Sequence, residues 1–547
     1  MSNGHCRTAW SSYWYWLPAL LAAVFVLVYS DFGPTDDHNI LNSIFQGHAL
    51  PMCVYPEMGR FSPLCFQELN LFPDPTGNPE WFFLPQAIAL LVFCYCFSRV
   101  LTEVGCSQWR PAVLLTFLLL SPGFVTIWLR IQLVERNFVV FLTVFLLLYV
   151  LVEKGRRSLL LPALATGTVA MYFKEPGFIV IGVFAATHWL LQFKNGYRQW
   201  NWMDFLLLVS AGCYLPVYYF VVFSKRVLLY GSHSSTVAEF LTTLAKTAGN
   251  FALNDPLIFF VALPLAGWRA YRIMRNHVTA DPLFDAMLIA GATYALIFFP
   301  LNIFSVYYWT PVYVFSVPAT IHFYSKYKES TRGRGYWRFS MKTVALLLAV
   351  SVLPSGVHLI SYYKYVPINF NATVDFIAKD IQQKQIATMP GIYIESSMTP
   401  DAPSIYYDSF NIFLQVRGGL KAGQFAIRSS AMPTTDRQLR THGQELAIGD
   451  PLYAAYYSVV ALPPKVAPST GDYLVIIPQT ATEIDRDYLK RLQQSCCDLV
   501  FSTSSTFAVP NLSLKILLKL AATRLGLGDS MGKNYFEFPD YFVFVRR

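Results

Sequence analysis

Long apolar runs separated by short polar connections fill about the first two thirds of the chain. A helix that crosses the hydrocarbon core of a bilayer needs about 20 mostly apolar residues. The first run has a thin basic flank and no small-residue cleavage site, so we interpret it as a span rather than a signal peptide. We predict eleven spans, at about 11–30, 81–103, 111–129, 136–153, 158–173, 177–193, 203–223, 256–273, 284–301, 303–324 and 341–361.

The pattern changes after residue 362, where short apolar runs alternate with polar segments. Four of these runs are rich in β-branched and aromatic residues, which predicts buried strands. They lie at 392–395, 473–477, 499–501 and 541–545. Residues 481–494 have apolar positions at helical spacing, and so does the basic segment 512–525. We therefore predict an α-helical polytopic membrane domain at 1–362 and a soluble α/β domain at 363–547.

The amino-acid composition indicates that most of the protein lies within a lipid bilayer. Charged residues make up 14% of the chain, whereas soluble proteins carry about 25%. The net charge of +9 raises the question of nucleic-acid binding, but the basic residues cluster in short loops, so we expect no nucleic-acid partner. The nine cysteines show no metal-ligand spacing. Cys53 and Cys65 share one loop and could form a disulfide in an oxidising compartment.

Lys and Arg are unevenly divided between alternate connections of the predicted spans. Because cytoplasmic loops carry the excess of positive charge, the richer set is predicted to be cytoplasmic, together with the N-terminus. This set contains Arg110, Lys154, Arg156, Arg157, Lys194, Arg198, Arg269, Arg272, Arg275, Lys326, Lys328, Arg332, Arg334 and Arg338. The long connections 31–80 and 224–255 and the C-terminal domain then lie outside, as in an integral protein of a bacterial inner membrane.

Two adjacent carboxylates, Asp36 and Asp37, stand where the first predicted span meets the outer loop. Apolar residues at 40, 41, 44 and 45 follow at helical spacing, so the pair heads a short amphipathic helix. One aspartate there can serve simply as an N-cap, since its oxygen accepts an orphan backbone N–H. The alternative is a catalytic role, which the following clusters favour.

Three further charged clusters fall at the same predicted face. They are Arg60 in the segment 59–64, the pair Glu135–Arg136 in the segment 130–136, and Lys174–Glu175 in the segment 173–177. Charged side chains at helix ends are often lipid-facing anchors, which is the alternative for each cluster alone. Taken together they mix acids with bases, which favours a polar cavity.

Such a cavity suits the transfer of a sugar from a lipid-linked donor. A carboxylate can accept the proton of an acceptor hydroxyl, and Asp36, Asp37 and Glu135 are the candidates. Arginine and lysine can bind a phosphate leaving group, and the candidates are Arg60, Arg136 and Lys174. Such a leaving group needs positive charge where negative charge develops, rather than a general acid.

On these residues the chain resembles the GT-C superfamily of membrane glycosyltransferases, which includes protein O-mannosyltransferases and the aminoarabinose transferases of lipid A. The resemblance covers roughly residues 1–320. It implies that Asp36 and Asp37 stand at the position of a catalytic acidic residue or Asp-Glu pair after the first span. It also implies that Arg60, in Arg-Phe-Ser-Pro-Leu, replaces a lysine that contacts the donor phosphate.

The remaining motifs of the resemblance lie further along the chain. Lys174 in Lys-Glu-Pro-Gly is similar to a Lys-Gly motif, and Glu135 to a second acidic position. Tyr307 and Tyr308 resemble a tyrosine-rich start of a late span, which implies a place beside the donor phosphate. The chain departs from the family in three ways. It has Asp-Asp for Asp-Glu, its helix from Asp36 to Gly47 is about one turn shorter than in the aminoarabinose transferases, and its C-terminal domain has no matching motif.

The expected donor is a polyprenyl-phosphate-linked sugar, and the acceptor is a glycan, a lipid or a secreted protein. We expect no resident cofactor. An aspartate pair can hold a divalent ion, but no further ligands stand at metal spacing, so no metal is expected. The principal alternative is a transporter or flippase for a lipid-linked glycan. That class favours charges within spans and repeated, broken helices, whereas here the charges sit at one face without an internal repeat.

Overall fold

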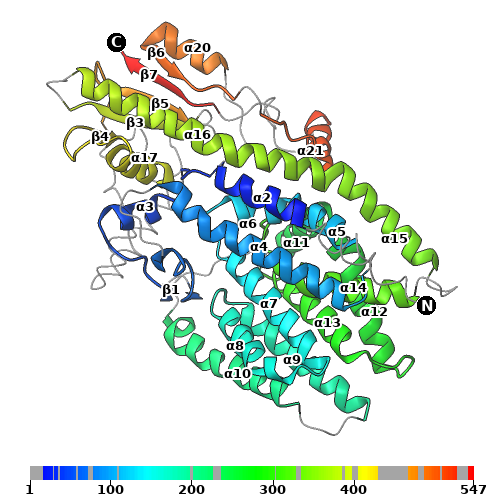
Figure 1. The fold of residues 1–547 in the computed structure, drawn as a ribbon. Coiled ribbons are helices and arrows are strands. Elements are labelled where there is room, and N and C mark those ends of the chain that lie inside the picture. Colours follow the sequence, from blue (N-terminus) through cyan, green and yellow to red (C-terminus); the bar gives the residue numbers. More distant parts are fainter. Residues whose placement is uncertain are drawn as a thin grey trace, which may run out of the picture. The chain divides into compact units, whose positions relative to one another are not determined.

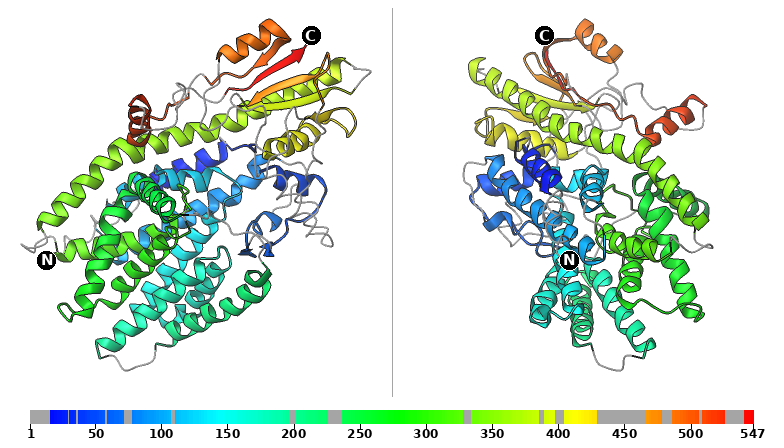
Figure 2. Two further views of the ribbon diagram at one scale, coloured as in Figure 1. Left: turned by 180° about the vertical axis from the view of Figure 1, so that it is seen from behind. Right: turned by 45° about the vertical axis from the view of Figure 1, so that its right-hand side comes forward.

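The computed structural model is mostly helical and divides into two compact units (Figures 1 and 2). The helical unit comprises Met1–Val28, Met52–Phe66 and Leu84–Gly356. The C-terminal unit comprises Tyr29–Pro51, Gln67–Phe83 and Val357–Arg547. The structure describes residues 16–28, 30–34, 37–56, 59–71, 78–106, 110–196, 201–225, 236–301, 303–327, 334–384, 389–396, 404–428, 466–477, 486–505, 508–525 and 540–547.

Each of the eleven apolar segments predicted to span the membrane overlaps a helix. The helices are α2 (Trp16–Val28), α4 (Pro79–Glu103), α5 (Arg110–Leu119), α6 (Pro122–Leu129), α7 (Glu135–Glu153), α8 (Leu160–Met171), α9 (Gly177–Lys194), α10 (Trp202–Val221), α12 (Leu263–Met274), α13 (Pro282–Ile297), α14 (Thr310–Tyr327), α15 (Arg334–Leu347) and α16 (Leu353–Lys384). Among the described residues, five helical segments are long and apolar enough to cross a membrane, or seven if each sharply bent pair counts as one. The protein is therefore an integral membrane protein by length and composition, and the number of eleven spans stays a prediction.

The third predicted span is not one helix. α5 and α6 meet at an angle of 69°, and Ser121 between them has extended backbone angles. The cause lies in Pro122, which has no N–H to continue the ladder of α5 and instead starts α6 at its first position. Gly123 follows, and a methyl group at this position would come within 2.6 Å of the Val306 carbonyl oxygen. The glycine thus allows α6 to pack against the chain just before α14.

A second break precedes the predicted span 256–273. The amphipathic run seen in the sequence forms α11 (Val237–Asn254), which begins with a capping box between Thr236 and Glu239. The chain then bends by 108° at Asp255 into a π-helical turn (Ile258–Ala262) and α12. Part of the predicted outer loop 224–255 is therefore a helix, and its residues 226–235 lie outside the described segments.

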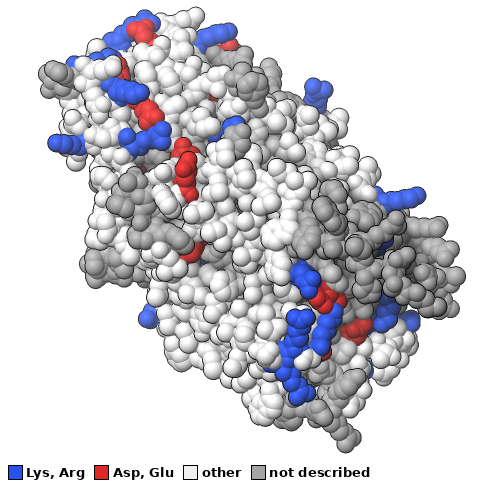
Figure 3. Space-filling model, in the orientation of Figure 1, with Lys and Arg blue, Asp and Glu red and all other residues white. Residues whose placement is uncertain are grey.

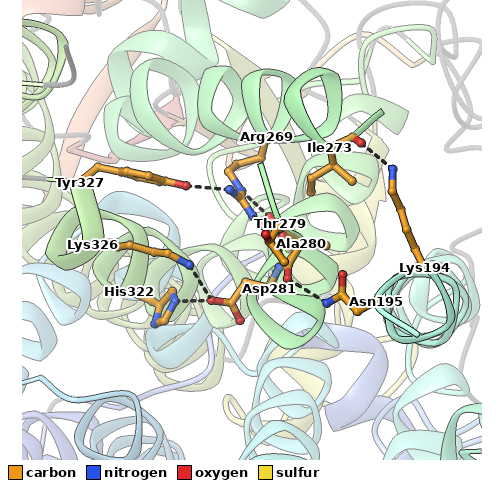
Figure 4. Close-up of polar contacts among 11 residues, drawn as sticks. Lys194, Asn195, Arg269, Ile273, Thr279, Ala280, Asp281, His322, Lys326 and Tyr327 are labelled. Atoms are coloured by element: carbon orange, nitrogen blue, oxygen red, sulfur yellow. Dashed lines mark hydrogen bonds and ion pairs between the residues drawn. The ribbon is translucent and has the colours of Figure 1, made fainter. Parts of the chain in front are cut away.

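Helices α7 to α10, α13 and α14 pack side by side and alternate in direction (Figures 1 and 2). One end of this bundle contains the starts of α7, α9 and α14, and the other contains their ends. At the latter end Arg269 is fully buried and forms two hydrogen bonds with Asp285, at 2.7 and 2.6 Å. Figure 4 shows how neighbouring contacts join α9, α12, α13 and α14 there, with His322 and Lys326 both on the Asp281 carboxylate. The charge of Arg269, within α12, is therefore balanced by Asp285.

Exposed side chains of the helical unit are largely apolar. Leu17, Leu21 and Val24 of α2 are 55–63% exposed, and Ile88 and Tyr95 of α4 are 49% and 44% exposed. Figure 3 shows broad uncharged areas on the molecular face, with Lys and Arg gathered in groups. An apolar exposed surface of this kind suits contact with lipid chains.

The last predicted span continues far beyond its expected end. α15, a π-helical turn (Leu348–Val352) and α16 form one helical stretch, of which Phe339–Lys384 comprises 46 residues. The predicted domain boundary at residue 362 lies inside this stretch, and the two compact units meet along the chain between Gly356 and Val357 of α16.

The C-terminal unit contains a five-stranded sheet in the order β4-β3-β5-β7-β6. Its strands are β3 (Gly391–Ser396), β4 (Ala426–Arg428), β5 (Tyr473–Ile477), β6 (Cys497–Ser502) and β7 (Phe542–Arg546). β3 is parallel to β4 and β5, whereas β7 is antiparallel to β5 and β6. The four predicted strands are confirmed, and β4 was missed because it has only three residues.

Helices accompany this sheet. α20 (Arg486–Ser495) packs Leu489 and Leu492 against the buried strand residues Tyr393, Leu474 and Phe544. α17 (Ser404–Val416) and α21 (Leu514–Arg524) complete the described helices after α16. The mixture of parallel strands and covering helices confirms the α/β prediction for the C-terminal region.

Candidate functional site

The predicted helix after the aspartate pair is α3 (Asp37–Phe45), in the C-terminal unit. Asp37 is its first residue and is 7% exposed. Its Oδ2 accepts a hydrogen bond from the backbone N–H of Gly33 at 2.8 Å, four residues earlier. Asp37 thus closes the turn that leads into the helix. Asp36 lies outside the described residues.

α3 is buried on both its apolar and its polar side, unlike the half-exposed amphipathic helix that the sequence predicts. Asn39, Asn42 and Ser43 are at most 6% exposed, and His38 is 1% exposed. α17 of the same unit packs against α3. Ser409 of α17 lies 3.0 Å from Nδ1 of His38, so a polar contact replaces solvent on this side.

The chain just before α3 is fixed by α16 and α17. The amide Nδ2 of Asn371, in α16, donates to Oδ2 of Asp31 at 2.8 Å and to the carbonyl oxygen of Phe32 at 3.2 Å. Arg417, which follows α17, lies 4.0 Å from the same aspartate and bonds Asp375 of α16 at 2.8 and 3.0 Å. Burial raises the pKa of Asp31, although Arg417 and Asn371 oppose this change. The chain at Asp31 and Phe32 is therefore held by contacts from α16 and from Arg417.

In the helical unit, a short hairpin brings Arg60 to the start of α9. Strands β1 (Cys53–Tyr55) and β2 (Arg60–Ser62) are antiparallel. Nε of Arg60 donates to Oε1 of Glu175 at 3.0 Å, and the backbone N–H of Phe61 donates to the same oxygen at 3.0 Å. Tyr214 of α10 also bonds the Phe61 carbonyl oxygen at 3.1 Å. One carboxylate thus fixes the arginine and its strand together.

Glu175 is charged despite its surroundings. Burial by itself would raise the pKa of its carboxyl group. The charges of Arg60 and Lys174, with backbone N–H donors that include that of Phe61, outweigh burial and hold the pKa below its ordinary value. The sequence analysis includes Glu175 in the segment 173–177 but predicts no role for it. Its position next to Lys174 was the available signal.

Lys174 and Glu135 form a buried ion pair next to this contact. Lys174 lies in the turn between α8 and α9 and is 5% exposed, and Glu135 begins α7 and is 2% exposed. The Lys174 ammonium group also lies 4.7 Å from the ring centre of Tyr308, a cation–π distance. The structure therefore brings together Arg60, Lys174, Glu135 and Tyr308 from the predicted set, at one end of the helix bundle.

The aromatic residues before α14 are firmly placed. The Tyr307 and Tyr308 rings lie 5.0 Å apart, and Tyr308 stacks on Phe298 of α13 at 4.9 Å. The indole N–H of Trp309 donates to the carbonyl oxygen of Ala295 at 3.2 Å. These contacts fix the segment that carries Tyr308 to the last turns of α13.

Arg136 has different surroundings from the other candidate cations. It is 1% exposed, and its Nη1 lies 3.4 Å from the carbonyl oxygens of Arg130 and Ile131. These oxygens belong to the turn between α6 and α7, so the guanidinium group braces the start of its own helix. Its phosphate-binding role stays a prediction from sequence.

The arrangement can bind an anion by exchange of partners. Arg60 and Lys174 each face a carboxylate, so an incoming phosphate would compete with Glu175 and Glu135 for their N–H groups. Within the described part of the chain, no group of three or more His, Cys, Asp or Glu residues is arranged to hold a metal ion.

Comparison with known proteins gives only distant structural likenesses. No family model matches the chain, and no curated protein matches its sequence. An oligosaccharyltransferase from Archaeoglobus fulgidus, in its apo form, is similar over 86% of this chain and 70% of its own, with 12% identity and a TM-score of 0.44. ArnT from Cupriavidus metallidurans, bound to undecaprenyl phosphate, is similar over 89% of this chain and 95% of its own, with 14% identity and a TM-score of 0.44.

Both neighbours are GT-C glycosyltransferases, the superfamily that the sequence motifs resemble. The A. fulgidus enzyme has also been solved with Zn and sulfate, and with an inhibitory peptide and a dolichol-phosphate. At identities of 12% and 14% and TM-scores of 0.44, these likenesses carry no information on the function of this chain.

Proposed function

We propose that the protein is an integral-membrane glycosyltransferase that moves a sugar from a polyprenyl-phosphate donor to an acceptor at the extracytoplasmic face. The observation that carries the proposal is the pairing of two cations with two carboxylates at one end of the bundle, Arg60 with Glu175 and Lys174 with Glu135. Burying charged groups costs free energy, so a cluster of charged side chains at the end of apolar helices indicates a functional site.

The two cations would bind the phosphate that remains on the lipid after transfer. Arg60 offers a planar fork of N–H donors, and Lys174 offers a compact charge placed over the Tyr308 ring. As the bond between sugar and phosphate breaks, negative charge grows on the phosphate oxygens. Positive groups already in position stabilise that charge more than they stabilise the ground state.

The acceptor would be activated by a carboxylate of the aspartate pair. Asp37 already accepts the Gly33 N–H, so we assign it to the turn and assign Asp36 to proton acceptance. The acceptor hydroxyl or amide attacks the anomeric carbon, its proton passes to the carboxylate, and the phosphate leaves with the bonding electron pair. Acceptors that fit this chemistry are glycans, lipids and secreted proteins.

The distribution of positive charge supports an extracytoplasmic placement. Arg60, Lys174 and Glu135 stand near the start of α7, whereas Lys154, in one of the loops rich in Lys and Arg, follows its end. Positive loops favour the cytoplasmic side, so the site end is assigned to the outside.

Binding of undecaprenyl phosphate to the purified protein tests the phosphate site. Lys174→Met and Arg60→Ala should each weaken binding by several kcal/mol, because a buried or half-buried donor to an anion is lost. Lys174→Met should also lower the melting temperature, because it leaves Glu135 buried without its cation, so binding is compared at a temperature where all the proteins are folded. Lys154→Met is a matched control, since Lys154 also pairs with a carboxylate, Glu103, but at the other end of α7. Equal binding by all four proteins would contradict the proposal.

A further inference from the structure

Tyr294 of α13 is fully buried, yet its hydroxyl group has no hydrogen-bond partner in the described part of the chain. Buried hydroxyl groups are nearly always paired, because leaving one unpaired destabilises the protein. Phenylalanine would fill the same space without this cost. The hydroxyl group therefore calls for an explanation.

Its surroundings connect Tyr294 to the phosphate site. The Tyr294 hydroxyl group interacts electrostatically with Glu135 and Glu175. The Tyr294 ring lies 6.1 Å from that of Phe138, which is one helical turn beyond Glu135 on α7. Its other ring neighbour is Phe298, on which Tyr308 of the site stacks. Tyr294 thus stands behind the Lys174–Glu135 pair.

When the sugar donor binds, the Glu135 carboxylate would require a new hydrogen-bond donor. Glu135 is 2% exposed and its cation is Lys174. When the donor phosphate takes over the Lys174 ammonium group, Glu135 remains buried with a weaker positive partner. A buried carboxylate that loses its partner is strongly destabilised unless another donor replaces it.

We propose that Tyr294 is this replacement donor: when Lys174 moves toward the donor phosphate, the released Glu135 carboxylate shifts to accept a hydrogen bond from the Tyr294 O–H. Tyr294 is then a positioning residue that acts through Glu135. The inference rests on the proposed function, because it requires that Lys174 binds phosphate. It also gives the Tyr294 hydroxyl group, which has no partner among the described residues, a hydrogen-bonding role.

Two tyrosine variants separate this role from simple packing. Tyr393, in β3, is likewise fully buried with an unpaired hydroxyl among the described residues, so Tyr393→Phe is a matched control. Melting temperature without ligand and affinity for undecaprenyl phosphate are measured for wild type, Tyr294→Phe and Tyr393→Phe, with Lys174→Met as a reference.

Both tyrosine variants should keep or raise the melting temperature, because each loses an unpaired buried group. Only Tyr294→Phe should bind undecaprenyl phosphate more weakly, by about tenfold, which corresponds to one hydrogen bond to a charged group. Unchanged affinity in Tyr294→Phe, or a melting temperature lowered below that of wild type, would overturn the inference while leaving the loss in Lys174→Met intact. No binding by wild type would instead contradict the proposed function.

Discussion

At the scale of single residues, the two adjacent aspartates are assigned different tasks. The side chain of Asp37 completes the turn before α3, and an asparagine there keeps an oxygen that accepts the Gly33 N–H. Asp36→Asn should therefore abolish sugar transfer while expression and donor binding persist, because proton acceptance is lost at nearly constant shape. Asp37→Asn should retain most transfer activity. If both variants transfer sugar at wild-type rates in a purified assay, the carboxylate lies elsewhere, and Glu135 is the next candidate.

The Glu175–Arg60 contact has a predictable pH dependence. The folded-state pKa of Glu175 lies below its ordinary value of 4.5, so its charge stabilises the fold above about pH 4.5 and this contribution disappears as the pH falls through the folded-state value. Glu175→Gln lacks the charge at every pH. Its loss of stability, about 1 kcal/mol for a partly exposed pair, should be constant from about pH 7 to pH 5 and shrink in more acidic solution. Thermal melting of both proteins across this range measures it, and a gap that widens in acid would contradict the assignment.

At the scale of elements, α16 and Arg417, which follows α17, hold the chain just before α3, and under the proposed mechanism this assigns the C-terminal unit a part in the reaction. Asn371→Ala removes one hydrogen bond to the Asp31 carboxylate and one to the Phe32 carbonyl oxygen. Because the buried carbonyl oxygen loses this donor, the free energy of unfolding should fall by about 1–3 kcal/mol. We expect the turnover rate to fall while affinity for undecaprenyl phosphate stays unchanged. Gln415→Ala is the control, since Gln415 bonds only Asn411 in the same helix among the contacts described for it. Equal effects of the two variants on turnover would refute the positioning role.

The sequence predicts the positions of helices and strands better than it predicts which side chains other elements bury. Apolar length is a local property, so every predicted span overlaps a helix, and the strands at 473–477 and 541–545 lie within two residues of the predicted bounds. The break at Ser121 was missed because the apolar run continues through Pro122, although that proline was a usable signal. The burial of His38 and Asn39 depends on α17, which follows hundreds of residues later, and no periodicity within α3 reveals it.

The candidate site shows the same limit. Arg60, Lys174, Glu135 and Tyr308 were found from charge and motif, and the structure joins them through contacts that no single motif contains. Glu175 was passed over because a carboxylate beside a lysine reads equally well as a solvated pair. Tyr294 carries no sequence signal at all, since an isolated tyrosine in an apolar helix is ordinary. Only the contacts seen in the structure identify Glu175 and Tyr294 as candidate site residues.

At the scale of the whole molecule, the account depends on a lipid-linked phosphate reaching one end of the helix bundle. The exposed apolar side chains of α2 and α4 suit a protein surrounded by lipid, from which such a donor would enter. A transporter would use the same lipid contact but would place its charged groups along a path through the membrane. Here Arg60, Lys174 and Glu135 gather near helix ends.

The most direct measurement is an experimental structure of the protein bound to undecaprenyl phosphate. Phosphate density is expected within hydrogen-bond distance of Lys174 Nζ and the Arg60 guanidinium group, with the contacts to Glu135 and Glu175 loosened. Density for the phosphate at the opposite end of the bundle, near Arg269 and His322, or with both Lys174 and Arg60 still closed on their carboxylates, would contradict it.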